Sequence, residues 1–422
     1  MKRLAKLLFL LFQKFFPKTM ESIYFSIKGA GTTLQKSEET TLHVQKKSTN
    51  IQNLNYYKRV FEKNRNPSTN LNKIDIAFIV PKPIEGSGGH RNFYRAIKYL
   101  YEFGHDMTVY YTQTTESTDD VKSQVSNWFY DMKDIPYICY DGKLGYHDIA
   151  VATWWETAYM LNENINKVKF GFYFVQDFEP AFNPISSTYI LAENSYKLGL
   201  SHICSGKWCK DFLSEKYQAE AEFFQFPVDV ETYNTNKPRT KINKNIIFFA
   251  KPEMLRRCYE IGIMALKELN RLNPDVEIIL FGSNHVDKSQ IDFPVTVFGL
   301  VPTINDLADL YRNADLGLVF STTNPSLVPY EMLSCGCPVA DLNLEKSVSK
   351  YGDSNDNVFL CSPEPIKLAK ELCSILDDSD TLSFKANKGM KWVHDVFPAE
   401  VEMARRIEAM IKKKINNGCI EL

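Results

Sequence analysis

The 422-residue sequence lacks the patterns that identify several common classes of protein. Its nine cysteines are scattered, and none forms a CxxC pair or a Cys/His set with the spacing of a zinc site. An odd number of cysteines in a long chain argues against a disulfide framework. We therefore expect a protein of the reducing cytoplasm.

An excess of charge of one sign is also missing. The chain has 50 basic and 51 acidic residues, so its formal net charge is -1. This balance gives no general attraction to nucleic acid, and we expect no nucleic-acid partner. The hydrophobic share of 44% is that of an ordinary globular protein, and the length predicts two or three domains.

The N-terminal segment, MKRLAKLLFLLFQKFF, is too short and too basic to span a bilayer. It has no clear uninterrupted apolar core or small-residue cleavage site of a signal peptide. Basic residues recur at helical spacing opposite leucine and phenylalanine, which predicts an amphipathic helix over residues 1–16. Such a helix contacts a membrane surface, or else docks on its own domain or a partner subunit. The protein would then be cytoplasmic and peripheral on the inner face of the cell membrane.

No tandem repeat of solenoid length is visible, but short apolar runs alternate with helical patterns from residue 74 onward. A polar stretch at 231–245 interrupts the alternation and predicts an interdomain linker. We predict an α/β protein with two Rossmann-like, doubly wound parallel-sheet domains that face a cleft. The expected segments are an N-terminal helix and connector at 1–70, a first domain at 71–235, a second domain at 236–385 and a C-terminal helix at 386–422.

The apolar runs, and the glycine and proline residues that flank them, predict the helices and strands. Strands are expected at 74–81, 107–111, 149–153, 170–175, 202–204, 224–229, 245–251, 276–282, 295–301 and 315–320, and from 338 onward. Helices are expected at 92–103, 257–272 and 304–312, near 365–376, and along a tail at 384–414.

A glycine-rich run at 85–90 lies between the first expected strand and its helix. Glycines let the backbone approach a ligand, and the helix that follows directs free N–H groups to the same place. The run is neither GxGxxG nor a P-loop, so the dinucleotide fingerprint is absent, and a plain strand-to-helix turn is the alternative. The candidate substrate-binding residues here are Gly88, Gly89, His90 and Arg91.

Three basic residues follow the first strand of the second domain: Lys251, Arg256 and Arg257. Cations at that edge of a sheet can clamp a diphosphate and offset the charge on a departing nucleotide. Two arginines in the first turn of a helix are unfavourable unless an anion meets them. A solvated basic helix end is the alternative.

The stretch TNPSLVPYEMLSCGCPVAD at 323–341 is the most informative part of the chain. It places Glu331, with Tyr330 beside it, in the first turns of a helix that starts at the C-terminal edge of a strand. Nucleotides dock at that edge in open α/β sheets, and one carboxylate there can accept both ribose hydroxyls. An exposed surface glutamate is the alternative, although its neighbours are apolar.

Carboxylates also follow a strand of the first domain, in QDFE at 176–179. Asp177 and Glu179 could orient an acceptor hydroxyl or stabilise a cationic sugar, or could be a helix cap and a surface charge. Trp154 and Trp155 suit either sugar stacking or core packing. The Asp-Ser-Asp run at 378–380 lies in a polar turn, and we predict no metal there.

Together these motifs resemble the GT-B glycosyltransferases of family 4, and more narrowly the WsaF-like rhamnosyltransferase branch that builds bacterial surface glycans. The resemblance extends from residue 74 to about 397. It rests on GlyGlyHisArgAsn at 88–92, ValGlnAspPheGluPro at 175–180, AlaLysPro…ArgArg at 250–257 and AsnProSer…ProTyrGluMet…CysGlyCysProVal at 324–339.

The resemblance implies an acceptor domain at 71–235, a donor domain at 236–385 and a C-terminal helix that returns to the first domain. It implies that Lys251 and Arg256 bind the donor diphosphate and that Glu331 binds the nucleotide ribose. It also implies that Gln176 stands where many relatives have a histidine near the donor sugar. Thr323 stands where relatives have the first glutamate of the E-x7-E motif. Its presence fits a deoxysugar such as rhamnose better than glucose or mannose.

The resemblance therefore predicts a retaining, metal-independent enzyme without a cofactor. It would move a sugar from a dTDP- or UDP-linked donor to a glycan or lipid-linked saccharide acceptor. Catalytic roles fall to Lys251, Arg256 and Asp177. A non-catalytic sugar-binding subunit of a glycan-assembly complex and a GT-B nucleotide-sugar epimerase are the alternatives.

Overall fold

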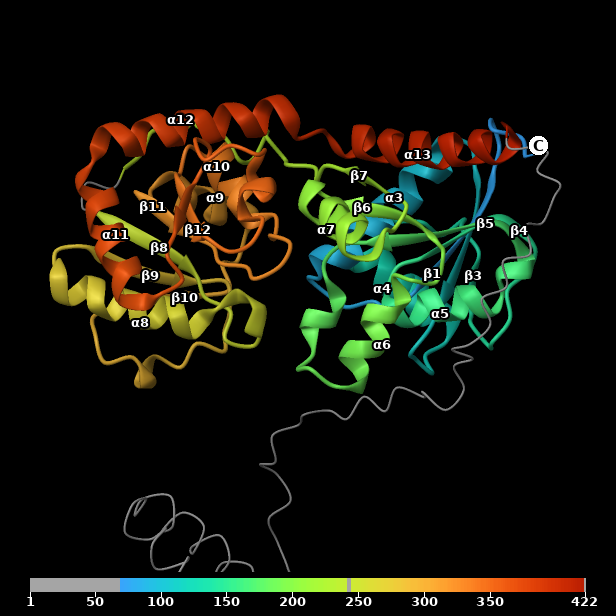
Figure 1. Ribbon diagram of the computed structural model, residues 1–422, viewed down its shortest axis with the longest axis horizontal. Helices are drawn as coiled ribbons and strands as arrows, with labels where there is room; N and C mark the ends of the chain where they lie inside the picture. Colours follow the sequence, from blue (N-terminus) through green and yellow to red (C-terminus); the bar gives the residue numbers. More distant parts are fainter. Residues whose placement is uncertain (1–68, 241–243, 421–422) are drawn as a thin grey trace, which may run out of the picture. The chain divides into compact units, whose positions relative to one another are not determined.

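The computed structural model describes residues 69–240 and 244–420. The predicted amphipathic helix at 1–16 lies outside the described residues, as does the predicted connector up to residue 68. The described residues contain two parallel β-sheets with flanking helices, shown in Figure 1. The predicted class, two doubly wound α/β domains, is confirmed.

The first sheet has seven parallel strands in the order β3-β2-β1-β4-β5-β6-β7. Its strands are β1 (Asp75–Val80), β2 (Asp106–Tyr111), β3 (Tyr137–Cys139), β4 (His147–Ala152), β5 (Val168–Val175), β6 (Ser201–Ser205) and β7 (Ala221–Phe224). Its helices are α3 (Gly88–Glu102), α4 (Thr118–Trp128), α5 (Trp155–Glu163), α6 (Ser187–Ser195) and α7 (Lys207–Tyr217).

The second sheet has six parallel strands in the order β10-β9-β8-β11-β12-β13. Its strands are β8 (Asn245–Phe249), β9 (Glu277–Phe281), β10 (Thr296–Gly299), β11 (Leu316–Leu318), β12 (Val339–Leu342) and β13 (Phe359–Cys361). The helices of this half are α8 (Tyr259–Leu272), α9 (Ile304–Arg312), α10 (Val328–Ser334), α11 (Pro365–Asp377) and α12 (Ser379–Val396).

Both sheets reverse their strand order next to their first strand. In the first sheet β1 pairs with β2 on one side and β4 on the other, and in the second sheet β8 pairs with β9 and β11. Ligands of doubly wound sheets bind beyond the carboxyl ends of the strands at this switch point. The loops after β1, β4, β8 and β11 are therefore the places where a site is expected.

The central strands are nearly continuous apolar runs because helices cover both faces of each sheet. In β1 all five residues after Asp75 are buried. Close packing of α10 on β11 depends on Gly317, since a Cβ there would lie 2.4 Å from the Met332 sulfur. The helix that carries Glu331 is thereby held directly against the sheet.

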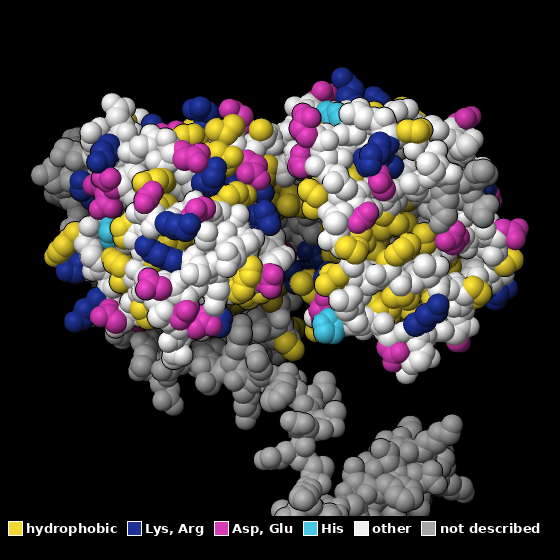
Figure 2. Space-filling view, turned by 180° about the vertical axis from the view of Figure 1, so that it is seen from behind, with side chains coloured by type: hydrophobic (Ala, Val, Ile, Leu, Met, Phe, Trp, Pro, Cys, Tyr) yellow, Lys and Arg dark blue, Asp and Glu magenta, His cyan; other side chains and the backbone are white. Residues whose placement is uncertain are grey.

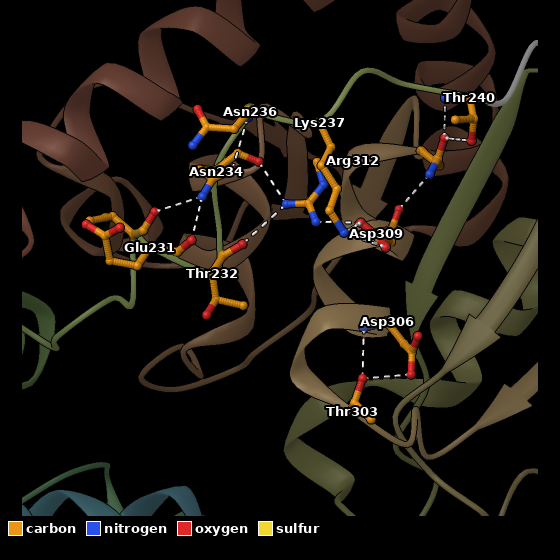
Figure 3. Close-up of polar contacts among 12 residues, drawn as sticks. Glu231, Thr232, Asn234, Asn236, Lys237, Thr240, Thr303, Asp306, Asp309 and Arg312 are labelled. Atoms are coloured by element: carbon orange, nitrogen blue, oxygen red, sulfur yellow. Dashed lines mark hydrogen bonds and ion pairs between the residues drawn. The ribbon is translucent and has the colours of Figure 1, made fainter.

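The chain between β7 and β8 has no regular element in its described part and is fastened to α9 (Figure 3). The Arg312 guanidinium donates to the backbone oxygens of Thr232 and Asn234, at 3.3 and 3.0 Å. The Asp309 carboxylate forms ion pairs with Arg312 at 2.5 Å and with Lys237 at 3.2 Å. The polar linker expected at 231–245 therefore has fixed contacts with the second half of the chain.

The C-terminal tail is two helices rather than the single helix expected over 384–414. Helix α12 ends at Val396, and α13 (Glu400–Ile420) begins after a break that contains Pro398. Proline lacks a backbone donor and disfavours helix in the residue before it. Helix α13 lies along α3 in Figure 1, and Met403, Ile407 and Ile411 are buried in the core of the first sheet.

Several element boundaries also differ from the prediction. Helix α3 starts at Gly88 instead of residue 92, because Ser87 caps it by accepting from the His90 N–H. The strand expected at 224–229 shares only Phe224 with β7 (Ala221–Phe224), and residues 225–229 form no strand. Strands β3 and β13, three residues each, were not predicted.

Candidate functional site

The candidate residues of the first sheet follow β1 and β5. Of the glycines after β1, only Gly86 has a positive φ, at +70°, whereas Gly88 and Gly89 form the first turn of α3. Gly88 and Arg91 are exposed. These two residues and the partly exposed Gly89 remain available to a ligand.

The structure corrects the substrate-binding role predicted for His90. Its side chain is buried among Phe93, Tyr94 and Phe129, and its Nδ1 accepts from the backbone N–H of Ile84 at 3.2 Å. An imidazole held in this way fixes the glycine-rich loop to α3. The predicted substrate contact is therefore wrong for this residue, because proximity in sequence to the glycines says nothing about the direction of its side chain.

Gln176 follows β5 and joins it to the start of α3. Its Nε2 donates to the backbone oxygen of Gly89 at 2.9 Å, and its Oε1 accepts from Asn92 at 3.1 Å. Asn92 in turn accepts from Arg95 at 3.0 Å. The amide of Gln176 thus lies beside the glycine-rich turn with both polar atoms bound to protein groups, and its place near the donor sugar stays a prediction.

Asp177 contacts the second half of the chain. Its Oδ2 pairs with the Nε of Arg256 at 3.2 Å, and its Oδ1 accepts from the backbone N–H of Asn324 at 3.0 Å. No acceptor-orienting role is visible in these contacts, since both oxygens bind protein groups. The carboxylate instead bridges the loop after β5 and the loops after β8 and β11.

The structure also corrects the substrate-binding role predicted for Glu179. It is 3% exposed, and its Oε2 accepts from the Trp155 N–H at 2.7 Å and from the Tyr173 hydroxyl at 2.8 Å. Burial raises its pKa to about 8, against the opposing effect of these donors. A carboxyl group enclosed in this way supports the fold around α5 and does not reach a substrate.

Lys251 lies two residues beyond the end of β8, over the ring of Phe249. Its Nζ is 3.2 Å from Glu253, which also accepts from Ser283 at 2.8 Å. Glu253 therefore fixes the lysine on the loop between β8 and α8.

Arg256 and Arg257 were expected in the first turn of a helix, but they do not lie in one. They belong to a short 3-10 turn, η4 (Leu255–Arg257), and α8 starts only after Cys258, whose φ is +50°. The argument from an unfavourable first helical turn therefore does not apply. Both arginines do lie between β8 and α8, at the switch point, and their contact with a diphosphate stays a prediction.

The two arginines have different surroundings. The guanidinium of Arg256 lies 4.2 Å from the ring centroid of Phe182, which stacks on Trp154 at 5.8 Å. Arg257 is 5% exposed, and burial lowers its pKa to about 10. Its Nε and Nη1 have no hydrogen-bond partner among the described residues. Arg257 is thus an interior cation near Asp341 and Asp177.

Glu331 stands in the first turn of α10 and is half-buried. Burial raises its pKa to about 7, and the negative charge of Asp229 adds to the shift, whereas Tyr311 opposes it. The helix follows β11, the neighbour of β8, so Glu331 and Lys251 belong to loops at one edge of the sheet.

The substrate-binding role predicted for Tyr330 is corrected as well. Its ring packs on Phe397 with centroids 4.4 Å apart, and its hydroxyl donates to the backbone oxygen of Lys350 at 3.1 Å. The residue is 3% exposed and belongs to the core beneath α10. Helix α10 turns Tyr330 inward and leaves the neighbouring Glu331 only half-buried.

Two residues of this region were not predicted as site residues. Asn324 is 1% exposed, and its amide donates to the backbone oxygens of Gln176 and Ser205, both at 2.8 Å. Phe182 follows β5 and supports Arg256. Asn324 was noted as a loop residue, but its partners Gln176 and Ser205 lie 148 and 119 positions earlier in the chain, and no local pattern points to them.

Two negative findings concern the described residues only. Over 69–240 and 244–420, no three His, Cys, Asp or Glu side chains are arranged to hold a metal ion. Within the same ranges, no helix combines the length and hydrophobicity of a membrane span. Basic and acidic side chains are interspersed on the face shown in Figure 2, as the balanced charge suggests.

Two family models match the chain. Residues 107–204 match the family described as WsaF, N-terminal domain, and residues 244–373 match WsaF, C-terminal domain. The two stretches cover more than half of the chain, one in each sheet.

One curated relative is the O-antigen biosynthesis protein RfbC of Myxococcus xanthus, which is 31% identical over 223 residues. The match covers 52% of this chain and 17% of that protein, so the chain spans less than a fifth of the relative's length.

Solved structures resemble the chain over both sheets. Alr3699/HepE of Anabaena in complex with UDP has a TM-score of 0.60 at 14% identity, over 81% of this chain and 100% of that one. Sucrose-phosphate synthase of Thermosynechococcus elongatus has a TM-score of 0.58 at 13% identity, over 81% and 100%. WaaG, a glycosyltransferase involved in lipopolysaccharide biosynthesis, has a TM-score of 0.52 at 14% identity, over 78% of this chain and 98% of that one. At such identities the likeness concerns the fold.

Proposed function

We propose that the chain, which has the GT-B fold and regions similar to both WsaF domains, is a glycosyltransferase that transfers a sugar from a nucleotide-sugar to a growing bacterial surface glycan. The observation that carries the proposal is the switch point of the second sheet. Lys251 and Arg256 follow β8 there, and Glu331 follows the adjacent β11. Two cations and one carboxylate at this edge suit a diphosphate and a ribose.

In the proposed reaction, Lys251 and Arg256 offset the charge that develops on the departing nucleoside diphosphate. Glu331 accepts hydrogen bonds from the ribose hydroxyls. Gln176, which follows β5 and contacts the first turn of α3, lies near the donor sugar in this proposal. Closure of the two domains excludes water, which would otherwise hydrolyse the donor. The proposed reaction retains the anomeric configuration and needs no metal.

The finer part of the proposal concerns the donor and the product. The family resemblance places Thr323 where a sugar-contacting glutamate is expected, and this supports rhamnose or another deoxyhexose on dTDP or UDP. The role of the Myxococcus protein in O-antigen biosynthesis supports a surface glycan, on a saccharide or lipid-linked saccharide acceptor. We place the reaction in the cytoplasm, with peripheral contact to the membrane through residues 1–16.

A direct test is incubation of the full-length protein with dTDP- and UDP-sugars, with and without a mixture of glycan acceptors. Release of nucleotide that depends on an acceptor supports the transferase. Conversion of the donor without any acceptor would indicate an epimerase. Failure to bind any nucleotide would contradict both and favour the accessory sugar-binding subunit.

A further inference from the structure

One carboxylate of the first domain holds both loops of the proposed diphosphate site. Asp177 follows β5, is almost completely buried, and reaches Arg256 with Oδ2 at 3.2 Å and the N–H of Asn324 with Oδ1 at 3.0 Å. Arg256 lies after β8 and Asn324 after β11, the two strands of the switch point. A single side chain therefore connects the first domain to each loop that flanks the site.

The contact with Asp177 uses only part of the guanidinium of Arg256. The ion pair occupies Nε, and the ring of Phe182 lies against the guanidinium carbon at 4.2 Å. Among the described residues, the two terminal amino groups of Arg256 make no hydrogen bond. Those groups form the planar fork that binds phosphate oxygens, so the arginine is fixed in position while its phosphate-binding face stays available.

The loop after β11 is fixed from several sides. The amide of Asn324 donates to Gln176 and Ser205 of the first domain, and Asp341 accepts from the N–H of Ser321 at 3.1 Å. The N–H of Thr322 donates to the backbone oxygen of Arg256 at 3.0 Å, which joins the two loops directly. A shift at Asp177 would therefore reach both loops together.

We propose that Asp177 is a positioning residue that completes the diphosphate subsite from the opposite domain. It holds Arg256 through Nε and the loop after β11 through Asn324, so that the subsite is complete only when the two domains are closed. This inference rests on the proposed function, in which Arg256 binds the donor diphosphate. It replaces the acceptor-orienting role that the sequence suggested for Asp177.

A simple counter-ion would behave in the opposite way. If Asp177 only neutralised Arg256 until a diphosphate displaced it, removal of its charge would strengthen the binding of an anion. If Asp177 positions Arg256, its removal weakens the binding of the second phosphate. The sign of the effect therefore distinguishes the two roles.

The experiment compares the affinities of full-length variants for UDP and UMP, and for dTDP and dTMP, by isothermal titration. The ratio of diphosphate to monophosphate affinity reports on the subsite alone. D177N keeps an oxygen for the Asn324 N–H but removes the charge opposite Arg256. We expect D177N and R256A each to lower this ratio about tenfold, as for loss of a charge-assisted hydrogen bond.

Further variants complete the design. The D177N/R256A double variant should be no worse than R256A, because the two residues act through one interaction. F182L should lower the ratio without changing any charge, because the Phe182 ring supports the same guanidinium. D177E keeps the charge but displaces the carboxylate, and serves as the second variant if D177N does not fold; an unchanged ratio in D177E would overturn the positioning role. D292N is the matched control, since Asp292 forms an exposed ion pair with Lys267 and should leave the ratio unchanged.

The outcomes separate the inference from the function on which it rests. An unchanged or higher ratio in D177N, with R256A impaired, overturns the positioning role alone. Equal losses of monophosphate and diphosphate affinity in D177N would also overturn it, because a general structural defect acts on both. An unchanged ratio in R256A would instead contradict the proposed diphosphate site itself.

Discussion

At the scale of single residues, Glu331 combines partial burial with a proposed role, binding of the ribose hydroxyls, that requires charge. Burial raises its pKa to about 7, where an exposed glutamate would ionise near 4.5. A carboxylate accepts hydrogen bonds from two ribose hydroxyls, whereas the protonated acid has lost part of that capacity. The ionised form increases as pH rises through about 7, so nucleotide affinity should increase in the same direction.

This dependence can be measured by titrating UDP or dTDP into the wild type and Glu331→Gln between pH 6 and 8.5. We expect the affinity of the wild type, relative to the variant, to rise through this range and level off above it. The variant corrects for the ionisation of the nucleotide phosphate. Glu331→Ala should weaken binding about tenfold without unfolding the protein. Parallel pH profiles for wild type and Glu331→Gln would remove Glu331 from the nucleotide site.

Glu179 should affect stability instead of binding. Its pKa is about 4.5 in an exposed setting and about 8 in the folded protein, because burial disfavours its charge. The folded state therefore binds the proton more tightly, and this contribution to stability is lost as pH rises from about 4.5 through 8.

The matching experiment is denaturant unfolding of the wild type and Glu179→Gln at pH 5 and pH 8.5. The wild type should lose stability relative to the variant at the higher pH, because the amide of the variant has no proton to lose in this range. The difference should be on the order of 2 kcal/mol or more. An equal change in both proteins would show that Glu179 is ionised without cost in the fold.

The sequence predicted which strands the candidate residues follow, but not which way their side chains point. Lys251 and Arg256 follow β8 and Glu331 follows β11, as expected from the buried apolar runs before them. His90 and Tyr330 were misplaced because a neighbour on a helix can face the core. The link from Asp177 to Arg256 joins residues 79 positions apart, and no local pattern encodes it.

At the scale of elements, the apolar runs placed most strands to within two residues, and the errors have identifiable causes. The αL conformation of Cys258 delays the start of α8, so that the two arginines lie in η4. Pro398 divides the tail into α12 and α13. The edge strands β3 and β13 are too short to give a periodic signal.

The packing of α10 on β11 gives a prediction for Gly317. A methyl group at this position would meet the Met332 sulfur at 2.4 Å, so Gly317→Ala should push α10 away from the sheet and cost about 1–3 kcal/mol. Glu331 moves with the helix, and nucleotide affinity should fall as well.

Thermal unfolding and titration with UDP or dTDP check both parts of this prediction. Gly88→Ala controls for the effect on stability alone, since no atom lies within 4 Å of a Cβ at that position. Its nucleotide affinity is not compared, because Gly88 is itself a candidate substrate-binding residue. A Gly317→Ala protein with the stability and affinity of the wild type would show that α10 has room to adjust.

At the scale of the whole molecule, α13 ties the end of the chain to the first domain. Met403, Ile407, Met410, Ile411 and Ile415 are all buried in the core of the first sheet. At the N-terminal end of the helix, Glu400 pairs with Arg95 at 2.8 Å, and further along Glu408 contacts His105 at 3.0 Å. The helix is therefore a structural part of the first domain, although it comes last in the sequence.

Removal of residues 400–422 should destabilise the first domain strongly. Loss of five buried aliphatic side chains, at roughly 1.5–3 kcal/mol each, exceeds the stability of many domains. We expect loss of cooperative unfolding and aggregation, measured by calorimetry and light scattering. A truncated protein that unfolds cooperatively at the wild-type temperature would contradict this account of α13.

The central claim is that a nucleoside diphosphate binds at the switch point of the second sheet. The most direct measurement is a crystal structure of the full chain with UDP or dTDP. The account predicts the diphosphate within hydrogen-bond distance of Lys251 and Arg256, and the ribose hydroxyls on Glu331. A nucleotide bound elsewhere, with these three side chains left without contact to it, would contradict the claim.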